Sequence, residues 1–478
     1  MGLKGGETGV KAQFKSLMRS DFLRFETLVE LRDAVIQQDD TDLTLPSKRD
    51  QTVVFMDGNV LMMSVPEAVG TLDAFSNVVY KYVRDAVRAG AVVVVVFDEP
   101  QHLTNAKKEE QARRDTSRAL RTVTTSADMQ TCPLSDDFTR EQLKQLPDVH
   151  ILKTNRACRS RFYDEVVKMV FERIAENMEK WNAAGHNAGV LVLDGVEARG
   201  GDRPPTEPRE TTMVGTDDAV VDALCRDVPI GEGDIKLTAL ENRVRHLVGE
   251  KHSAFEKIQL AITSTTDTDS FAIMLLDVAK RRVSPYSASL HSIFCMREPP
   301  SKRAREVDPD VKASFLCCDV VRLEAHIQEH LWSKSSATTP TPEQMLHAMT
   351  AFTSAAAICG CDFTLDGLKG ARFDHFWESI PQFVASEPQA LAQFGAVHST
   401  DATVARQAIK GLYRVCVNAS AHMETKPRYK KQAQTVSEVS DTLLLRAIWT
   451  SSYWSLNEHT ADTEWGFQPV LRTPDGQQ

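Results

Sequence analysis

The stretch Ala91-Val-Val-Val-Val-Val-Phe-Asp98 is a short, continuous apolar run that ends in an acid. The stretches Thr52-Val-Val-Phe-Met-Asp57 and Gly189-Val-Leu-Val-Leu-Asp194 have the same form, and Gln259-Leu-Ala-Ile-Thr-Ser-Thr-Thr-Asp267-Thr-Asp269 is a longer variant. Such runs are typical of strands that are buried on both faces of a parallel sheet. Helical periodicity lies between them, most clearly over 72–89. The alternation predicts an α/β fold with a mostly parallel central sheet flanked by helices, followed by a helical C-terminal region.

Acids at the ends of these runs are expected to meet at one edge of the sheet. In open α/β sheets, ligands bind just beyond the carboxyl ends of the strands. Neighbouring carboxylates repel one another, and hard divalent cations with oxygen ligands relieve that repulsion. The pattern therefore predicts a metal-dependent site that cleaves phosphodiesters. The alternative for each acid is a local role, because Asp after a strand is also typical of turns and helix caps.

Composition favours a soluble globular protein with a large core or with two to three domains. The chain has 478 residues, of which 42% are hydrophobic and 26% charged, and its net charge is −10. This charge argues against a general coating of nucleic acid but permits a local basic track. We expect no membrane span and no signal peptide. The nine cysteines lack disulfide-scaffold spacing, so buried thiols in a reducing compartment are preferred over a zinc site at Cys317-Cys318 and Cys359-Gly-Cys361.

Five short motifs follow one another over roughly the first 380 residues. They are Met1-Gly2-Leu-Lys-Gly5, Phe55-Met-Asp57-Gly-Asn59, Val96-Phe-Asp98-Glu-Pro100, Thr266-Asp267-Thr-Asp269-Ser270, and Gly360-Cys-Asp362-Phe363 followed by Asp366-Gly367-Leu-Lys369-Gly370. In this order they resemble the flap endonuclease/XPG family of structure-specific 5′ nucleases, especially the divergent members of large DNA viruses such as poxviruses. The resemblance implies a PIN-like fold.

One motif of that family departs from its usual form. The family has Gly-Glu-Ala-Glu-Ala at the entry to a helix, and the stretch ranked first here is Gly215-Thr-Asp217-Asp218-Ala219. The alternative is Asp194-Gly-Val-Glu197-Ala198, directly after its predicted strand. The choice decides which side chains complete the metal site, with Asp217 and Asp218 preferred and Asp194 and Glu197 as substitutes.

The resemblance implies two Mg²⁺ ions, for which Mn²⁺ is expected to substitute. In two-metal hydrolysis one cation activates the attacking water and the other stabilises the leaving oxygen. The first ion is assigned to Asp57, Asp98, Asp217 and Asp218, and the second to Asp267, Asp269 and Asp362.

A basic segment follows Asp98 and is expected to be helical. Lys107 and Arg114 lie seven residues apart, so they would share one helix face and hold the scissile phosphate. Lys108 and Arg113 are the alternative pair. The competing interpretation is a solvated surface helix in which Glu109 and Glu110 neutralise these bases.

Glycines near the chain start and after the last motif are the expected contacts to duplex DNA. By the resemblance these are Gly2 and the hairpin positions Gly367, Lys369 and Gly370. The alternatives are an ordinary N-terminal segment and a simple turn between helices. The patch Ser301-Lys-Arg-Ala-Arg305 is typical of a nuclear localisation signal or of a solvated linker.

The expected function is a metal-dependent endonuclease or 5′ exonuclease that cuts flap or junction DNA in replication, recombination or repair. A PIN-like ribonuclease and a catalytically inactive nucleic-acid-binding scaffold are the alternatives. The expected partners are DNA with junctions of single and double strands, with replication proteins as further candidates, and there is no clear sliding-clamp peptide. The expected location is intracellular, in the nucleus or at a viral replication site, and not secreted.

The predicted organisation has six segments. They are an N-terminal nuclease region (1–121), a mobile insert or arch (122–148), an internal nuclease region (149–298), a linker (299–313), a last strand with a DNA-binding helical hairpin (314–385), and a helical C-terminal region (386–478).

Overall fold

The computed structural model describes most of the predicted core. The described residues are 21–36, 47–98, 106, 109, 112, 138–154, 156–183, 189–193, 210–214, 218–225, 232–283, 290–298, 314–335, 340–359, 373–387, 390–399, 401–422 and 441–454.

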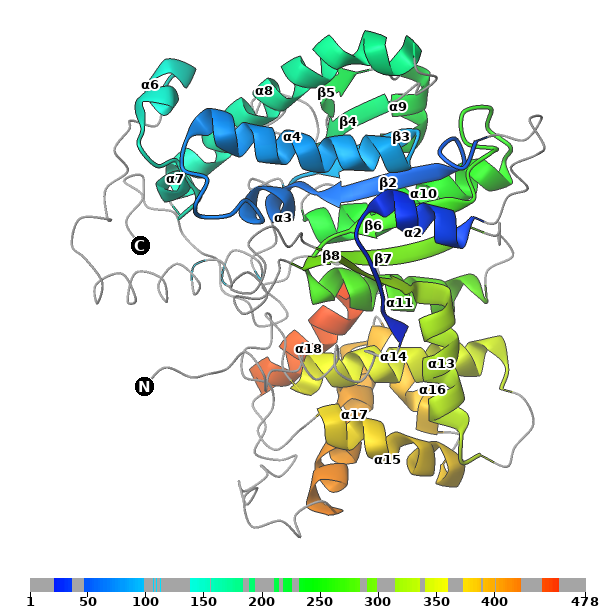
Figure 1. Cartoon of the computed structure of the whole chain (residues 1–478). Coiled ribbons are helices and arrows are strands. Elements are labelled where there is room, and N and C mark those ends of the chain that lie inside the picture. The colour runs from blue at the N-terminus through cyan, green and yellow to red at the C-terminus, as the bar shows by residue number, and fades with distance from the viewer. Residues whose placement is uncertain are drawn as a thin grey trace, which may run out of the picture.

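An eight-stranded sheet forms the middle layer, in the order β1-β8-β7-β6-β2-β3-β4-β5 (Figure 1). The strands are β1 (Leu23–Phe25), β2 (Thr52–Asp57), β3 (Val92–Val96), β4 (Gly189–Leu193), β5 (Glu210–Val214), β6 (Leu260–Ser264), β7 (His291–Glu298) and β8 (Ser314–Asp319). The five strands from β7 to β4 pair in parallel, whereas β8 with β7, β1 with β8 and β5 with β4 pair antiparallel. The predicted α/β class with a mostly parallel sheet is therefore confirmed.

Strand β2 lies in the centre, which explains why all six of its residues are buried. Its alternate side chains enter two different cores. Val54 and Met56 pack with helices α2 (Leu28–Val35), α4 (Leu72–Ala89) and α8 (Arg156–Ala183). Val53 and Phe55 face the opposite way, into the core formed with helices α9 (Asp218–Cys225) and α10 (Gly233–Gly249). This two-sided burial is the physical reason for the unbroken apolar runs.

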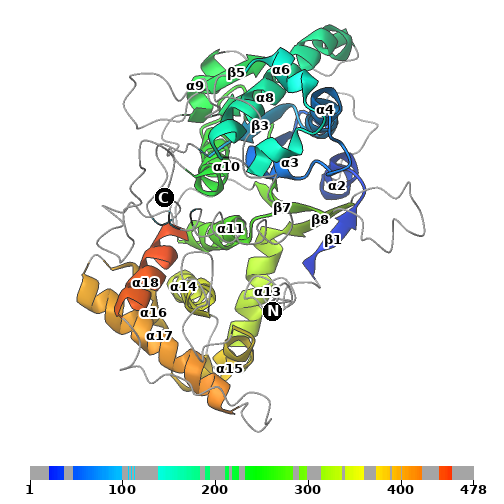
Figure 2. The same cartoon turned by 90° about the vertical axis from the view of Figure 1, so that its left-hand side faces the viewer.

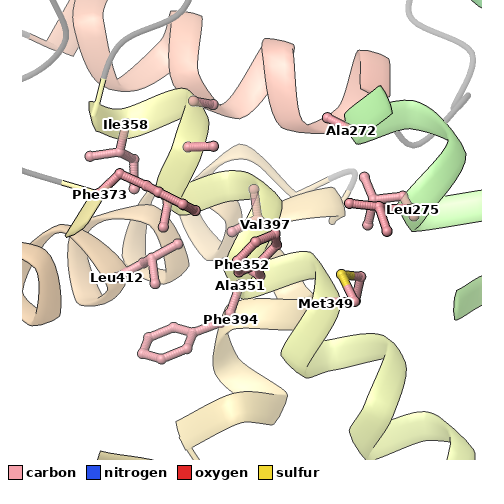
Figure 3. Close-up of a cluster of buried hydrophobic side chains, with 14 of the residues drawn as sticks. Ala272, Leu275, Met349, Ala351, Phe352, Ile358, Phe373, Phe394, Val397 and Leu412 are labelled. Atoms are coloured by element: carbon pink, nitrogen blue, oxygen red, sulfur yellow. The ribbon is translucent and has the colours of Figure 1, made fainter. Parts of the chain in front are cut away.

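The helices that follow the last strand pack below the sheet layer in Figure 1. They are α13 (Val320–Trp332), α14 (Pro342–Cys359), α15 (Phe373–Ser386), α16 (Ala390–Gly395), the 3₁₀ turn η4 (Ala396–His398), α17 (Ala402–His422) and α18 (Asp441–Trp454). Helix α14 is buried on every side from Ala348 to Cys359. Figure 3 shows Phe352 of α14 among Val397 and Phe394, with Leu275 of α11 (Thr268–Arg281) close to Met349. This shared core joins the C-terminal helices to the sheet layer.

Several helices and strands have no counterpart among the elements predicted above. The run Val149–Leu152 is also predicted as a strand from its apolar residues, but it lies largely in helix α7 (His150–Thr154), which packs on α8. A four-residue apolar run has too little periodicity to separate the two states. Part of the predicted insert is ordered as α6 (Arg140–Gln145), which begins with a capping box between Thr139 and Gln142. None of the helices in the described part of the chain is long and apolar enough to cross a membrane.

Candidate functional site

Asp57 and Asp98 follow neighbouring parallel strands, as predicted. Asp57 is the last residue of β2 and lies in register with Val96 of β3, two residues before Asp98. Both carboxylate oxygens of Asp57 are anchored. Oδ1 accepts the Val60 N–H at 3.0 Å, which caps the short helix α3 (Gly58–Met63), and Oδ2 accepts the Thr265 hydroxyl at 3.1 Å. Asp57 therefore caps α3 and also lies at the edge of the sheet where the site was predicted.

The charges around Asp57 show that three predicted ligands lie near one another. Burial, and after it the negative charges of Asp98 and Asp267, raise the pKa of Asp57 from 3.8 to about 7 against the lowering effect of the Val60 and Thr265 hydrogen bonds. These acids come from distant parts of the sequence and meet because β2 lies between β3 and β6. Their repulsion is what a bound divalent cation would relieve.

Asp267 and Asp269 lie at the start of helix α11. The Asp267 side chain caps this helix by accepting the Asp269 N–H at 3.0 Å, and its own N–H donates to Thr265 Oγ1 at 3.2 Å. Asp269 is buried in the first helical turn. The predicted cap role is therefore real, and it orients the same carboxylate that repels Asp57.

A second pair of acids, Glu232 and Asp234, lies at the start of helix α10 and was not predicted from the sequence. Both side chains are buried. The Gly233 N–H between them donates to Asp98 Oδ1 at 2.7 Å, which ties α10 to the end of β3. A Cβ at this glycine would lie 3.2 Å from the same oxygen, which is a tight contact, so a larger residue here would require the Asp98 carboxylate to move. Ser270 of α11 donates to Asp234, so the starts of α10 and α11 lie side by side.

The signal that identifies this pair is present in the sequence. Gly231-Glu-Gly-Asp234 is an acid-x-acid pair at a helix entry, as is Asp267-Thr-Asp269. Of the stretch around Asp217, the structure describes Asp218 as the first residue of α9, which packs on α10, and not its side chain.

Several predicted site residues lie outside the described part of the chain. They are the acids Asp194, Glu197, Asp217 and Asp362, the basic residues Lys107, Lys108, Arg113 and Arg114, and the DNA-contact positions Gly2, Gly367, Lys369 and Gly370. Within the predicted basic helix, the described positions Ala106, Glu109 and Ala112 are helical.

The described residues place several carboxylates near this edge but form no closed cage for a metal ion. Among the described residues, no group of three or more His, Cys, Asp or Glu side chains is arranged to hold a metal ion. Mg²⁺ usually keeps several of its waters, so carboxylates commonly bind it through water. The charge that Asp57, Asp98 and Asp267 concentrate at one edge fits this mode, and Glu232, Asp234 and Asp269 add oxygen donors nearby. Cys317, Cys318 and Cys359 are buried thiols in the core.

A cavity of about 490 Å³ lies on the α4 side of the sheet and reaches Asp57. Its wall includes Lys81 and Arg84 of α4 and Arg297 at the end of β7. The Arg297 guanidinium stacks on Tyr82, with its central carbon 3.4 Å from the ring centroid. Glu26 and Asp85 belong to the same wall, so basic and acidic side chains line this cavity together.

Comparison with protein-family models and with curated proteins gives no match for this sequence. The interpretation of the site therefore rests on its own geometry and on the motifs quoted above.

Proposed function

We propose that the protein is a Mg²⁺-dependent nuclease that cuts DNA at junctions between single and double strands. The observation that carries this proposal is the convergence of Asp57, Asp98 and Asp267, where burial and then the charges of Asp98 and Asp267 raise the pKa of Asp57 to about 7. Acids whose pKa is strongly shifted by burial and by neighbouring charges are typical of functional sites. Glu232 and Asp234 support the family resemblance, because they lie between the Asp98 and Asp267 motifs, where the family has its Glu-x-Glu pair.

The acids, the two helix starts and the basic residues would have different roles in this chemistry. Two bound Mg²⁺ ions would supply an activated water and stabilise the leaving oxygen. Asp57, Asp98 and Asp267 would hold the hydrated ions, and the positive ends of α10 and α11 support the negative charge at their first turns. Lys236 fixes the end of β3 by donating to the Phe97 carbonyl at 3.0 Å. Lys107 and Arg114 would hold the scissile phosphate.

The two alternatives differ in what now supports them. The departure of the acidic motif from the family pattern favours the inactive scaffold, whereas Glu232 and Asp234 would supply an acidic pair for the nuclease. The ribonuclease remains an alternative because carboxylates and cations act on phosphates without reading the sugar. DNA is preferred on the family resemblance, which also suggests a role in replication, recombination or repair.

The test is cleavage of a 5′-labelled flap duplex in Mg²⁺. We expect the wild type to cut near the junction. The double variants Asp267→Ala/Asp269→Ala and Glu232→Gln/Asp234→Asn should each lose about 10²-fold or more, as when groups that stabilise transition-state charge are removed. Asp222→Asn is the matched control, because this acid is exposed on α9.

Two results would contradict the proposal. A matched RNA flap cut faster than the DNA flap would favour the ribonuclease. Flap binding without cleavage in Mg²⁺ or Mn²⁺ would favour the scaffold.

A further inference from the structure

The cavity that reaches Asp57 lies at the end of the sheet where three neighbouring parallel strands finish. Its wall includes Met56 and Asp57 of β2, Ser264 of β6 and Arg297 of β7, together with residues of α3, α4 and the start of α2. Figure 2 shows these three helices close together on one side of the sheet. Ligands of open α/β sheets bind beyond the carboxyl ends of the strands, and a volume of about 490 Å³ is typical of small-molecule sites.

The Arg297 side chain is fixed in this wall by stacking and not by hydrogen bonds. Its guanidinium carbon lies 3.4 Å from the centroid of the Tyr82 ring, so the ring limits where the guanidinium can lie. Within the described part of the chain, Arg297 has no side-chain hydrogen bond and no ion pair. A guanidinium presents its N–H donors as a planar fork that matches the oxygens of a phosphate. The fork of Arg297 is therefore available to an anion in the cavity.

Two more basic side chains of the wall lie on one face of α4, three residues apart. The Arg84 Nε is buried, and no acceptor for it exists among the described residues. Arg84 Nη2 lies 3.9 Å from Asp85 Oδ1, which is too far for a hydrogen bond. Lys81 is exposed, and the described residues give its ammonium no polar partner. A buried donor without an acceptor costs stability, so an acceptor supplied by a ligand would account for the Arg84 Nε.

The charged residues of the wall give it a small excess of positive charge. Four basic side chains face three acids, so the excess is one charge when all of them are ionised. They are Lys81, Arg84, Arg88 and Arg297, and Glu26, Asp57 and Asp85. An excess of this size suits one phosphate group, whereas the further charges of a triphosphate would be repelled by the acids.

The rest of the wall is largely apolar. Leu28, Met56 and Leu61 are buried, and Phe315 of β8 is half-buried. Phe315 is directly opposite Arg297 in the antiparallel ladder of β7 and β8. Residues opposite each other in such a ladder project from the same face of the sheet, so the ring and the guanidinium are neighbours. Aromatic rings and arginine planes are the surfaces on which nucleobases stack.

We propose that this cavity binds a nucleoside monophosphate. Arg297, Arg84 and Lys81 hold its phosphate, and its base lies against Phe315 and the apolar wall. A free mononucleotide and the phosphorylated end of a single strand both present this chemistry. The proposal goes beyond the nuclease function and does not rest on it, because this binding needs neither a metal ion nor cleavage.

The test is a calorimetric titration of the full chain with deoxyadenosine 5′-monophosphate in EDTA. We expect saturable binding by the wild type. Arg297→Met and Arg84→Met should each weaken it by about 10–100-fold, as when a hydrogen-bonded charged group is removed. Arg173→Met is the matched control, because the Arg173 guanidinium also lies over a tyrosine of α4, 5.7 Å from the Tyr80 centroid, but does not line the cavity. Unfolding midpoints equal to that of the wild type show that the variants are folded.

Two further titrations, with inorganic phosphate and with a 5′-phosphorylated single-stranded tetranucleotide, identify the ligand. Tighter binding of the tetranucleotide than of the mononucleotide, with competition between them, supports the site and assigns it to a strand end. Weaker binding of the tetranucleotide supports the site and assigns it to a free mononucleotide. Inorganic phosphate that binds as tightly as the mononucleotide overturns the proposal, because the base then makes no contact.

The remaining outcomes separate this site from the nuclease function. No saturable binding of the mononucleotide by the wild type, or equal binding by the wild type, Arg297→Met and Arg84→Met, overturns the proposal even where the wild type cuts flap DNA in Mg²⁺. Binding that is weakened in both variants supports the site even where the wild type does not cut.

Discussion

The two acidic pairs begin neighbouring helices, but their first turns are capped in different ways. At α11 the cap is local, because Asp267 accepts the N–H of Asp269 two residues later. At α10 the residue in the equivalent place is Glu232, and within the described residues its side chain makes no capping hydrogen bond. The Gly233 N–H is taken instead by Asp98, which lies 135 residues earlier in the chain.

This difference shows how one helix start can be independent of the tertiary structure and the other depend on it. A local cap forms as soon as α11 forms, and it uses the carboxylate of Asp267 for that purpose. A distant cap forms only when β3 and α10 meet, and it leaves the Glu232 side chain out of the cap. Removing an acid should therefore have different structural consequences at the two helices.

The largest expected effect is at Asp98, which serves both the site and the cap of α10. We expect Asp98→Asn and Asp98→Ala to lower flap cleavage by about 10²-fold or more, because both remove a carboxylate from the cation site. Only Asp98→Ala also removes the acceptor for Gly233, so it should be less stable than Asp98→Asn by about 1 kcal/mol in urea unfolding. If Asp98→Asn cleaves the flap as fast as the wild type does, the proposed role of this carboxylate is contradicted.

The next effect concerns the pH dependence of stability without divalent cations. The pKa of Asp57 is raised from 3.8 to about 7 in the folded protein, so the folded state holds a proton that the unfolded state has released. Between pH 4 and 7 this group should therefore lower the free energy of unfolding by about 1 kcal/mol per pH unit, with no further loss above pH 7. The Asp57→Asn variant should lack this slope and be more stable than the wild type in EDTA at pH 8.

Addition of Mg²⁺ provides the control for that pH effect. A bound cation favours the ionised carboxylate, so the wild type should lose most of its slope in Mg²⁺ while Asp57→Asn changes little. Chemical unfolding from pH 4 to 8 with and without Mg²⁺ measures both. Equal slopes for the two proteins in EDTA would show that Asp57 is not the group that titrates.

The smallest effect tests the two caps directly by amide hydrogen exchange. Asp267→Ala should speed exchange of the Asp269 amide about five-fold, the equivalent of about 1 kcal/mol for a lost cap. Glu232→Ala should leave the Gly233 amide protected, because Asp98 still accepts its hydrogen bond. If the Gly233 amide exchanges faster in Glu232→Ala but not in Asp98→Ala, then α10 is capped locally by Glu232 and not by Asp98.

Much of the sheet layer could be predicted because its signals are local. The run 52–57 was predicted as a strand and is β2, and the periodicity over 72–89 matches α4, which Thr71 caps and Gly90 ends. The parallel pairing follows from the two-sided burial of such runs. The strands β1, β5 and β7 were not predicted from the sequence, and β1 and β5 lie at the sheet edges, where burial leaves a weaker pattern.

The candidate site was predicted only in part. Asp57, Asp98 and Asp267 were expected to meet, and the structure brings their charges together. Glu232 and Asp234 were not predicted, because sequence spacing alone does not show which acids lie beside Asp98.

The sequence by itself determined where the strands end and that acids follow them. The apolar run of a buried strand and the turn or helix cap after it are both patterns of neighbouring residues. Only the tertiary structure decided which acids face one another and which helix covers them. Those contacts depend on strand order and on helix packing, which join parts of the chain that no local pattern relates.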